Sequence, residues 1–88
     1  MDQVAVVIGG GQTLGAYLCE GLAEAGYKVA VADLNEENAK KIAGTINERH
    51  GAERALAFRV DATNEESVIA LDRQVAAGFG RADVRVYS

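Results

Sequence analysis

The 88-residue sequence has no proline and no tryptophan, a single cysteine, and few aromatic residues. Because Cys19 has no second cysteine to pair with, no internal disulfide can form, and we expect a cytoplasmic protein. Long apolar runs are also missing, since none approaches the roughly 18 residues that a membrane span requires. The composition therefore predicts neither a membrane protein nor a disulfide-stabilised secreted one.

Concentrated positive charge is absent as well. Nine Lys and Arg residues stand against thirteen Asp and Glu residues, which gives a formal net charge of −4. The basic residues are scattered along the chain and form no cluster that would attract a phosphate backbone, so we expect no nucleic-acid partner. His50, the only histidine, has no cysteine or histidine ligand near it in the sequence, and no metal site is expected.

The chain instead shows short apolar runs alternating with stretches of helical periodicity. Val4–Ile8 is uniformly apolar and mostly β-branched, which is typical of a strand buried on both faces of a parallel sheet. Strands are predicted at residues 4–8, 29–32, 55–60 and 84–87, with helices over residues 13–25, between Asn35 and Gly51, and between Thr63 and Gly80. The order βαβαβαβ predicts an α/β fold with a Rossmann-type parallel sheet, the N-terminal portion of a doubly wound domain.

The helices carry signals for their caps and buried faces. Asn35 is the expected N-cap of the second helix, and Thr63 with Glu66 is expected to form a capping box for the third. In the first helix, Leu14, Leu18 and Leu22 recur every four residues and are expected to form its buried stripe. Tyr17 and Tyr27 are expected to pack within the fold. Because no helix follows the fourth strand, we expect residues 1–88 to be one domain that is incomplete at its C-terminal end.

A glycine-rich segment joins the first strand to the first helix. Glycines there allow a tight turn and a close approach to a pyrophosphate, whose charge is met by the helix N-terminus. A tight turn without any ligand is the competing interpretation, and a P-loop is excluded because no Gly-Lys-Ser/Thr follows. The candidate residues of this segment are Gly9, Gly11, Gln12, Thr13, Leu14 and Gly15.

Asp33 ends the second strand and is followed by Leu34. In this fold an acidic residue at that position accepts hydrogen bonds from the adenosine ribose hydroxyls and repels the 2′-phosphate of NADP. Neither Leu34 nor Gln12 supplies a positive charge to offset that repulsion, so the expected cofactor is NAD(H). A solvated turn carboxylate is the alternative reading of Asp33.

Asp61 ends the third strand in the same way and is followed by Ala62. At the carboxyl edge of the sheet its side chain is expected to bond the adenine amino group, with Ala62 lining the ring. A capping or turn residue before the next helix fits the spacing nearly as well.

Two other residues stand out less. Cys19 has no neighbour that would activate a thiolate. A charged residue such as Arg85 within a strand is costly unless it is paired or exposed at an edge.

Together these residues resemble the short-chain dehydrogenase/reductase family over the whole chain. The family's Thr-Gly-x-x-x-Gly-x-Gly motif falls on Ile8–Gly15, with Ile8 in place of the threonine and Thr13 in place of the middle glycine. Asp61 matches the family's Asp-x-Thr adenine motif. Tyr87 and Ser88 stand where the family usually begins Asn-Asn-Ala-Gly.

The variant glycine loop and the ending Val-Tyr-Ser are similar to those of bacterial polyol-phosphate members of the family. That resemblance implies interconversion of D-sorbitol 6-phosphate and D-fructose 6-phosphate with NAD, in a cytoplasmic homotetramer that takes a sugar-phosphate substrate. The family's catalytic Asn, Ser, Tyr and Lys would lie beyond Ser88, so no catalytic residue is assigned. Other readings stay open: another NAD-dependent polyol or sugar dehydrogenase, a non-catalytic NADH-sensing Rossmann module, or a methyltransferase.

Overall fold

The computed structural model describes residues 3–88, which form four strands and three helices in strict alternation. Their bounds agree with the sequence prediction to within about two residues. The elements are β1 (Val4–Ile8), α1 (Thr13–Glu24), β2 (Lys28–Asp33), α2 (Glu36–His50), β3 (Ala55–Arg59), α3 (Glu65–Phe79) and β4 (Val84–Tyr87).

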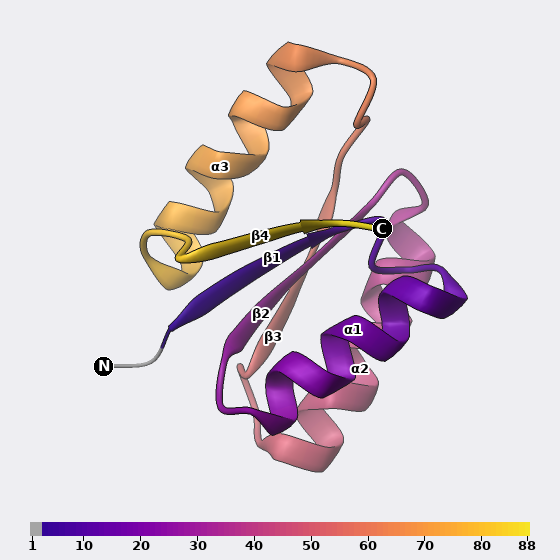
Figure 1. Cartoon of the computed structure of the whole chain (residues 1–88), viewed down its shortest axis with the longest axis vertical. Coiled ribbons are helices and arrows are strands. Elements are labelled where there is room, and N and C mark those ends of the chain that lie inside the picture. The colour runs from indigo at the N-terminus through magenta and orange to yellow at the C-terminus, as the bar shows by residue number, and fades with distance from the viewer. Residues whose placement is uncertain (1–2) are drawn as a thin grey trace.

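All four strands lie in one parallel sheet in the order β3-β2-β1-β4. Helices α1 and α2 cover one face of the sheet, and α3 covers the other (Figure 1). The chain builds outwards from β1 to β3 on one side and then crosses to place β4 on the other side of β1. The predicted Rossmann-type, doubly wound arrangement is thereby confirmed, and the crevice beyond the carboxyl ends of β1 and β4 lies where the strand order reverses.

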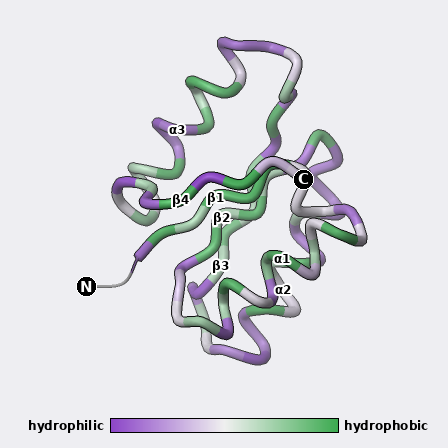
Figure 2. The backbone as a smooth tube through the Cα atoms, viewed as in Figure 1, coloured by the Kyte–Doolittle hydropathy of each residue, from purple (hydrophilic) through white to green (hydrophobic). Residues whose placement is uncertain are grey.

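Two hydrophobic clusters hold the layers together, one on each face of the sheet. Val7, Val29 and Val31 pack towards α1 and α2, whereas Val4 and Val6 pack towards α3. β1 is apolar along its whole length, and β2 is apolar between Lys28 at its start and Asp33 at its end. Figure 2 shows these strands in the hydrophobic colours, while polar residues concentrate on the helices and loops. The prediction that Val4–Ile8 is buried on both faces is confirmed, since each of its residues is at most 3% exposed.

The boundaries of α2 follow the capping signals read from the sequence. The Asn35 side chain accepts a hydrogen bond from the Asn38 N–H at 3.2 Å, and Glu36 and Glu37 occupy the first turn near the positive end of the helix dipole. Gly51 ends the helix with a φ of 111°, a conformation that favours glycine. His50, in the last turn, bonds Glu20 of α1 through its Nε2 at 2.8 Å and so connects the two helices.

The predicted capping box at the start of α3 is wrong. Asn64 is the N-cap, and its side chain accepts from the Ser67 N–H at 3.1 Å. Thr63 instead donates its N–H and its hydroxyl to the Asp61 carboxylate. As an N-cap, the Thr63 hydroxyl would accept from a backbone N–H of α3. It donates instead to the charged Asp61 carboxylate, and Asn64 caps the helix that starts at Glu65.

The predicted leucine stripe of α1 is also wrong in part. The residues that α1 buries are Gly15, Cys19 and Ala23, while Leu14 is 67% exposed. The helix lies so close to the glycine loop that a Cβ at position 15 would collide with the Gly9 carbonyl, and only small residues fit on that face. Of the predicted stripe, Leu22 alone packs against the core.

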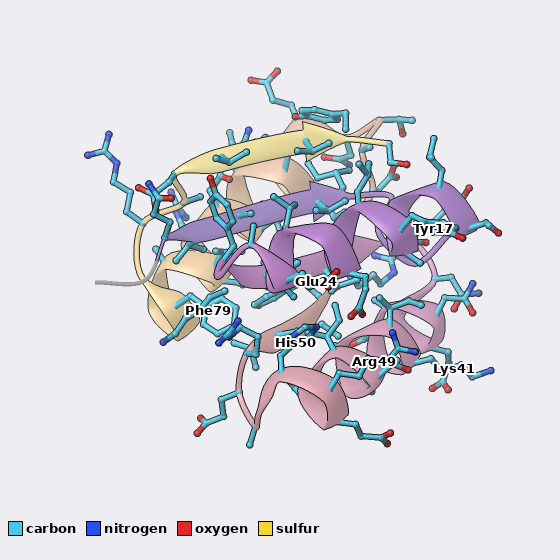
Figure 3. All side chains as sticks on the ribbon, turned by 60° about the horizontal axis from the view of Figure 1, so that its bottom comes forward. Tyr17, Glu24, Lys41, Arg49, His50 and Phe79 are labelled. Carbon is cyan, nitrogen blue, oxygen red and sulfur yellow. The ribbon has the colours of Figure 1, made fainter. Side chains whose placement is uncertain are left out.

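Tyr17, expected to pack within the fold, projects from α1 and is 78% exposed (Figure 3). Tyr27 packs against the core as expected. Arg85 of β4 pairs with Asp72 of α3, which meets one of the two conditions under which such a charge is tolerated. None of the helices in residues 3–88 has the length and apolar character needed to cross a membrane.

Candidate functional site

A cleft with a volume of about 240 Å³ opens at the carboxyl ends of the strands. It lies beside the glycine loop, and the segments that follow β2 and β3 and the end of β4 complete its walls. Those ends meet at one edge of the sheet because all the strands are parallel. Six of the predicted site residues line the cleft: Gly9, Gln12, Asp33, Leu34, Asp61 and Ala62.

Three backbone N–H groups of the glycine loop are bonded to the end of β2. Gly9 and Gly10 donate to the Ala32 carbonyl at 2.8 and 3.0 Å, and Gly11 donates to Asp33 Oδ2 at 3.0 Å. Gly9 has a φ of 89°, and a Cβ there would lie 2.9 Å from the Ser88 carbonyl oxygen. Glycine at position 9 is thus required both by the backbone conformation and by the close approach of β4.

The N-terminus of α1 faces the same edge of the sheet. Its N-cap residue, Gln12, makes no side-chain capping bond, and its carbonyl accepts from Ala16. Among the described residues, the N–H groups of Thr13 and Leu14 have no backbone acceptor, as is usual for the first turn of a helix. Such N–H groups, together with the helix dipole, are of the kind that binds anions at helix N-termini.

Asp33 is buried, with 4% of its surface exposed, yet it lines the cleft. Its Oδ1 accepts from the Asn35 N–H at 2.9 Å, and its Oδ2 accepts from the Gly11 N–H. An ionised carboxylate offers about four lone-pair sites, so each oxygen retains capacity for one more donor such as a ribose hydroxyl. The interpretation of Asp33 as a solvated turn carboxylate does not fit this burial.

Asp61 is more accessible and is bonded locally. Its Oδ1 accepts from the Thr63 hydroxyl at 2.6 Å and from the Thr63 N–H at 3.0 Å. The hydroxyl bond is the main reason that the pKa of Asp61 lies below its ordinary value, and the N–H bond adds to it. Asp61 therefore has the turn role that its spacing allowed, and it also lies on the wall of the cleft.

The other four predicted residues lie outside the lining of the cleft. Within the glycine loop, Gly11 packs against Asp33 and Asn38. Gly15, in the first turn of α1, is buried against Gly9. Thr13 and Leu14 are exposed in the first turn of α1. The structure thus gathers all ten predicted residues around one edge of the sheet.

The sequence reasoning missed further residues that line this edge. Asn38 of α2 contributes to a second hollow that adjoins the cleft at Asp33 and Leu34. No motif marked Asn38, since its position follows only from the way α2 packs beside the glycine loop. Thr63, Tyr87 and Ser88 stand at positions of the family's motifs but were not predicted to line the site. Sheet order brings them together with the remaining cleft residues, Ile8 and Val60.

The described residues offer little other reactive chemistry. No three His, Cys, Asp or Glu side chains within residues 3–88 gather in a way that suits a metal ion. Cys19 is buried, and this burial raises the pKa of its thiol to about 12. The expectation that Cys19 is not an activated thiolate agrees with this environment.

Comparison with known proteins places the chain in a family. The family described as short chain dehydrogenase matches residues 3–88. Sorbitol-6-phosphate 2-dehydrogenase of Escherichia coli is 57% identical over 88 residues, an alignment that covers all of this chain and 34% of the relative. The chain belongs to the short-chain dehydrogenase family, which confirms the resemblance read from its motifs.

Solved structures agree in fold as well as in sequence. The crystal structure of sorbitol-6-phosphate 2-dehydrogenase from Erwinia amylovora is 71% identical with a TM-score of 0.93, covering 96% of this chain and 33% of that one. A 3-ketoacyl-(acyl-carrier-protein) reductase from Brucella melitensis, solved with NADH, is 29% identical with a TM-score of 0.85, covering 94% and 32%. The chain spans about a third of the length of these proteins.

Proposed function

We propose that residues 1–88 form the NAD(H)-binding portion of an oxidoreductase that interconverts D-sorbitol 6-phosphate and D-fructose 6-phosphate. The observation that carries this proposal is the meeting of the glycine loop, the α1 N-terminus and Asp33 around one cleft. The 57% and 71% identities to two sorbitol-6-phosphate 2-dehydrogenases support the substrate. From the family resemblance we also propose that the complete protein is a cytoplasmic homotetramer.

The ADP half of the cofactor has counterparts in the site. The N–H groups of Thr13 and Leu14 bind the pyrophosphate, and Asp33 accepts hydrogen bonds from the adenosine ribose. Leu34 and Ala62 line the adenine, with Asp61 beside its amino group. NAD supplies the hydride acceptor for oxidation of the substrate alcohol, and we assign no catalytic residue within this chain.

The preference for NAD over NADP follows from the charges near the ribose position. Asp33 lines the cleft, and Glu36 and Glu37 occupy the first turn of α2, which begins three residues further along. The residues of the glycine loop, from Gly9 to Thr13, include no Lys or Arg. A 2′-phosphate placed here would meet negative charge and find no cation in the glycine loop, whereas the ribose hydroxyls of NAD would meet a hydrogen-bond acceptor.

Calorimetric titration of the chain with NADH, NADPH and S-adenosylmethionine tests the cofactor. We expect saturable binding of NADH, weaker binding of NADPH, and no binding of S-adenosylmethionine. Tighter binding of S-adenosylmethionine would instead support a methyltransferase.

The substrate is tested separately with a complete protein that contains this chain. We expect NAD-dependent oxidation of D-sorbitol 6-phosphate in preference to D-threitol, the alcohol in the name of a 37% identical relative from Mycolicibacterium smegmatis. A preference for D-threitol would point to a different polyol dehydrogenase. NADH binding without any dehydrogenase activity would favour a sensing module.

A further inference from the structure

Asp33 is the only charged or polar residue within positions 3–88 that is buried. A buried carboxylate must be compensated by hydrogen bonds, and here both oxygens accept backbone N–H groups from different segments. Asn35 N–H, two residues ahead, donates to Oδ1 at 2.9 Å, and Gly11 N–H, 22 residues back, donates to Oδ2 at 3.0 Å. Asp33 therefore connects the start of α2 to the glycine loop.

Gly11 is tightly packed between Asn38 and Asp33. A Cβ at Gly11 would lie 2.9 Å from Asn38 Cβ and 3.1 Å from Asp33 Cγ. With Gly9 and Gly10 already bonded to the Ala32 carbonyl, three consecutive N–H groups are directed at the end of β2. The loop then turns, so that the next N–H groups without backbone acceptors among the described residues are those of Thr13 and Leu14.

We propose that Asp33 is a positioning residue that holds the glycine loop in its nucleotide-binding conformation through the Gly11 N–H, independently of any contact with the ribose. The inference rests on the proposed function and deepens it. Without the carboxylate, the Gly11 N–H loses its charged acceptor and the loop that orients Thr13 and Leu14 loosens. Substitution of Asp33 then weakens binding even of a nucleotide that has no ribose hydroxyls to bond.

The first arm of the test needs no ligand. Amide hydrogen exchange measured by NMR should show that Asp33→Ala accelerates exchange at Gly11 by about tenfold or more, the effect of losing a bond to a charged acceptor. Asp33→Asn, whose amide retains one acceptor oxygen, should give an intermediate rate. Glu37→Gln removes a nearby exposed charge that does not touch the loop, and it should leave Gly11 unchanged. A Gly11 amide unaffected by Asp33→Ala overturns the proposal.

The second arm compares ADP with 2′,3′-dideoxyadenosine 5′-diphosphate, which lacks both ribose hydroxyls. A positioning role predicts that Asp33→Ala weakens binding of the dideoxy nucleotide by about tenfold. The affinity of Asp33→Asn should lie between those of Asp33→Ala and the wild type. Equal dideoxy binding by wild type and Asp33→Ala, with loss only for ADP, would show that Asp33 acts through the ribose alone. If wild type binds neither nucleotide, the proposed function fails, while the Gly11 exchange rate still decides the positioning role.

A general loss of folding is separated from positioning by amides remote from the site. Exchange at Leu71 and Val75, buried in α3 on the other face of the sheet, should be unchanged in Asp33→Asn. Faster exchange there to the same degree as at Gly11 would show a global effect and would count against the proposal.

Discussion

Cys19 is fully buried where α1 meets the sheet, and a Cβ at Gly10 would lie 3.0 Å from its Sγ. Its thiol is a core group, and the thiolate that reacts with alkylating agents is scarce because burial raises the pKa to about 12. We predict that iodoacetamide modifies Cys19 of the folded chain far more slowly than that of the urea-unfolded chain, as mass spectrometry would measure. Equal rates in both states would contradict the burial.

Asp61 gives a prediction about pH. Bonds from Thr63 depress the pKa of Asp61 in the folded chain below that of the unfolded chain. Because the pKa is depressed, these bonds favour folding fully above about pH 4 and lose that contribution as the pH falls through the folded-state pKa.

Thr63→Ala removes the hydroxyl bond and should shift the pKa of Asp61 upwards towards its ordinary value, as a carboxyl titration followed by NMR would measure. The matched variant Thr45→Ala removes a hydroxyl whose bond is to the Lys41 carbonyl, far from Asp61 in the sequence, and should leave the titration unchanged. A pKa of Asp61 that does not respond to Thr63→Ala would show that the hydroxyl is not the cause.

Single residues also show how much of the candidate site can be predicted from the sequence. Asp33 and Asp61 could be selected because each ends an apolar run, and parallel strands bring such ends to one edge. The bond between Asp33 and Gly11 could not be predicted, since it depends on the depth at which the loop lies against β2. Asn38 carried no signal for the same reason.

Among the helices, α1 was the least predictable, because two adjacent faces compete for the core. Hydrophobicity favours the face of Leu14 and Leu18, whereas the distance to the glycine loop selects the small residues Gly15, Cys19 and Ala23. Periodicity identifies a helix but does not measure how closely it approaches the sheet. The residues that α2 and α3 bury include the larger side chains Ile46, Leu71 and Val75, so burial follows hydrophobicity on those helices.

Two glycines of α1 provide a test of that packing. A glycine-to-alanine change in a helix ordinarily stabilises by about 0.5–1 kcal/mol. At Gly21 nothing lies within 4 Å of an added Cβ, and the residue is exposed, so Gly21→Ala should raise stability by about that amount.

At Gly15 an added Cβ would collide with the Gly9 carbonyl, so Gly15→Ala should instead lower stability by about 1–3 kcal/mol. Urea unfolding of both variants measures the difference. A stabilising Gly15→Ala would contradict the close contact between α1 and the glycine loop.

The molecule as a whole follows from the alternation of apolar runs and amphipathic stretches, which was sufficient to predict the parallel sheet and its element order. The parallel order β3-β2-β1-β4 brings the predicted site residues to the carboxyl edge of the sheet, where the strand order reverses beside β1. The ion pair of Arg85 with Asp72 could not be predicted, because it depends on how α3 packs beside β4. The substrate rests on relatives about three times as long as the chain, and not on its own residues.

The most direct test of the account is an amide NMR titration of the isotope-labelled chain with NADH and, separately, with NADPH. We predict that NADH shifts the amides of Thr13, Leu14, Leu34 and Ala62 and binds at least tenfold more tightly than NADPH, a ratio that corresponds to about 1.4 kcal/mol. Shifts confined to another surface, such as the hollow beside Asp72 and Arg81, or equal or tighter binding of NADPH, would contradict it.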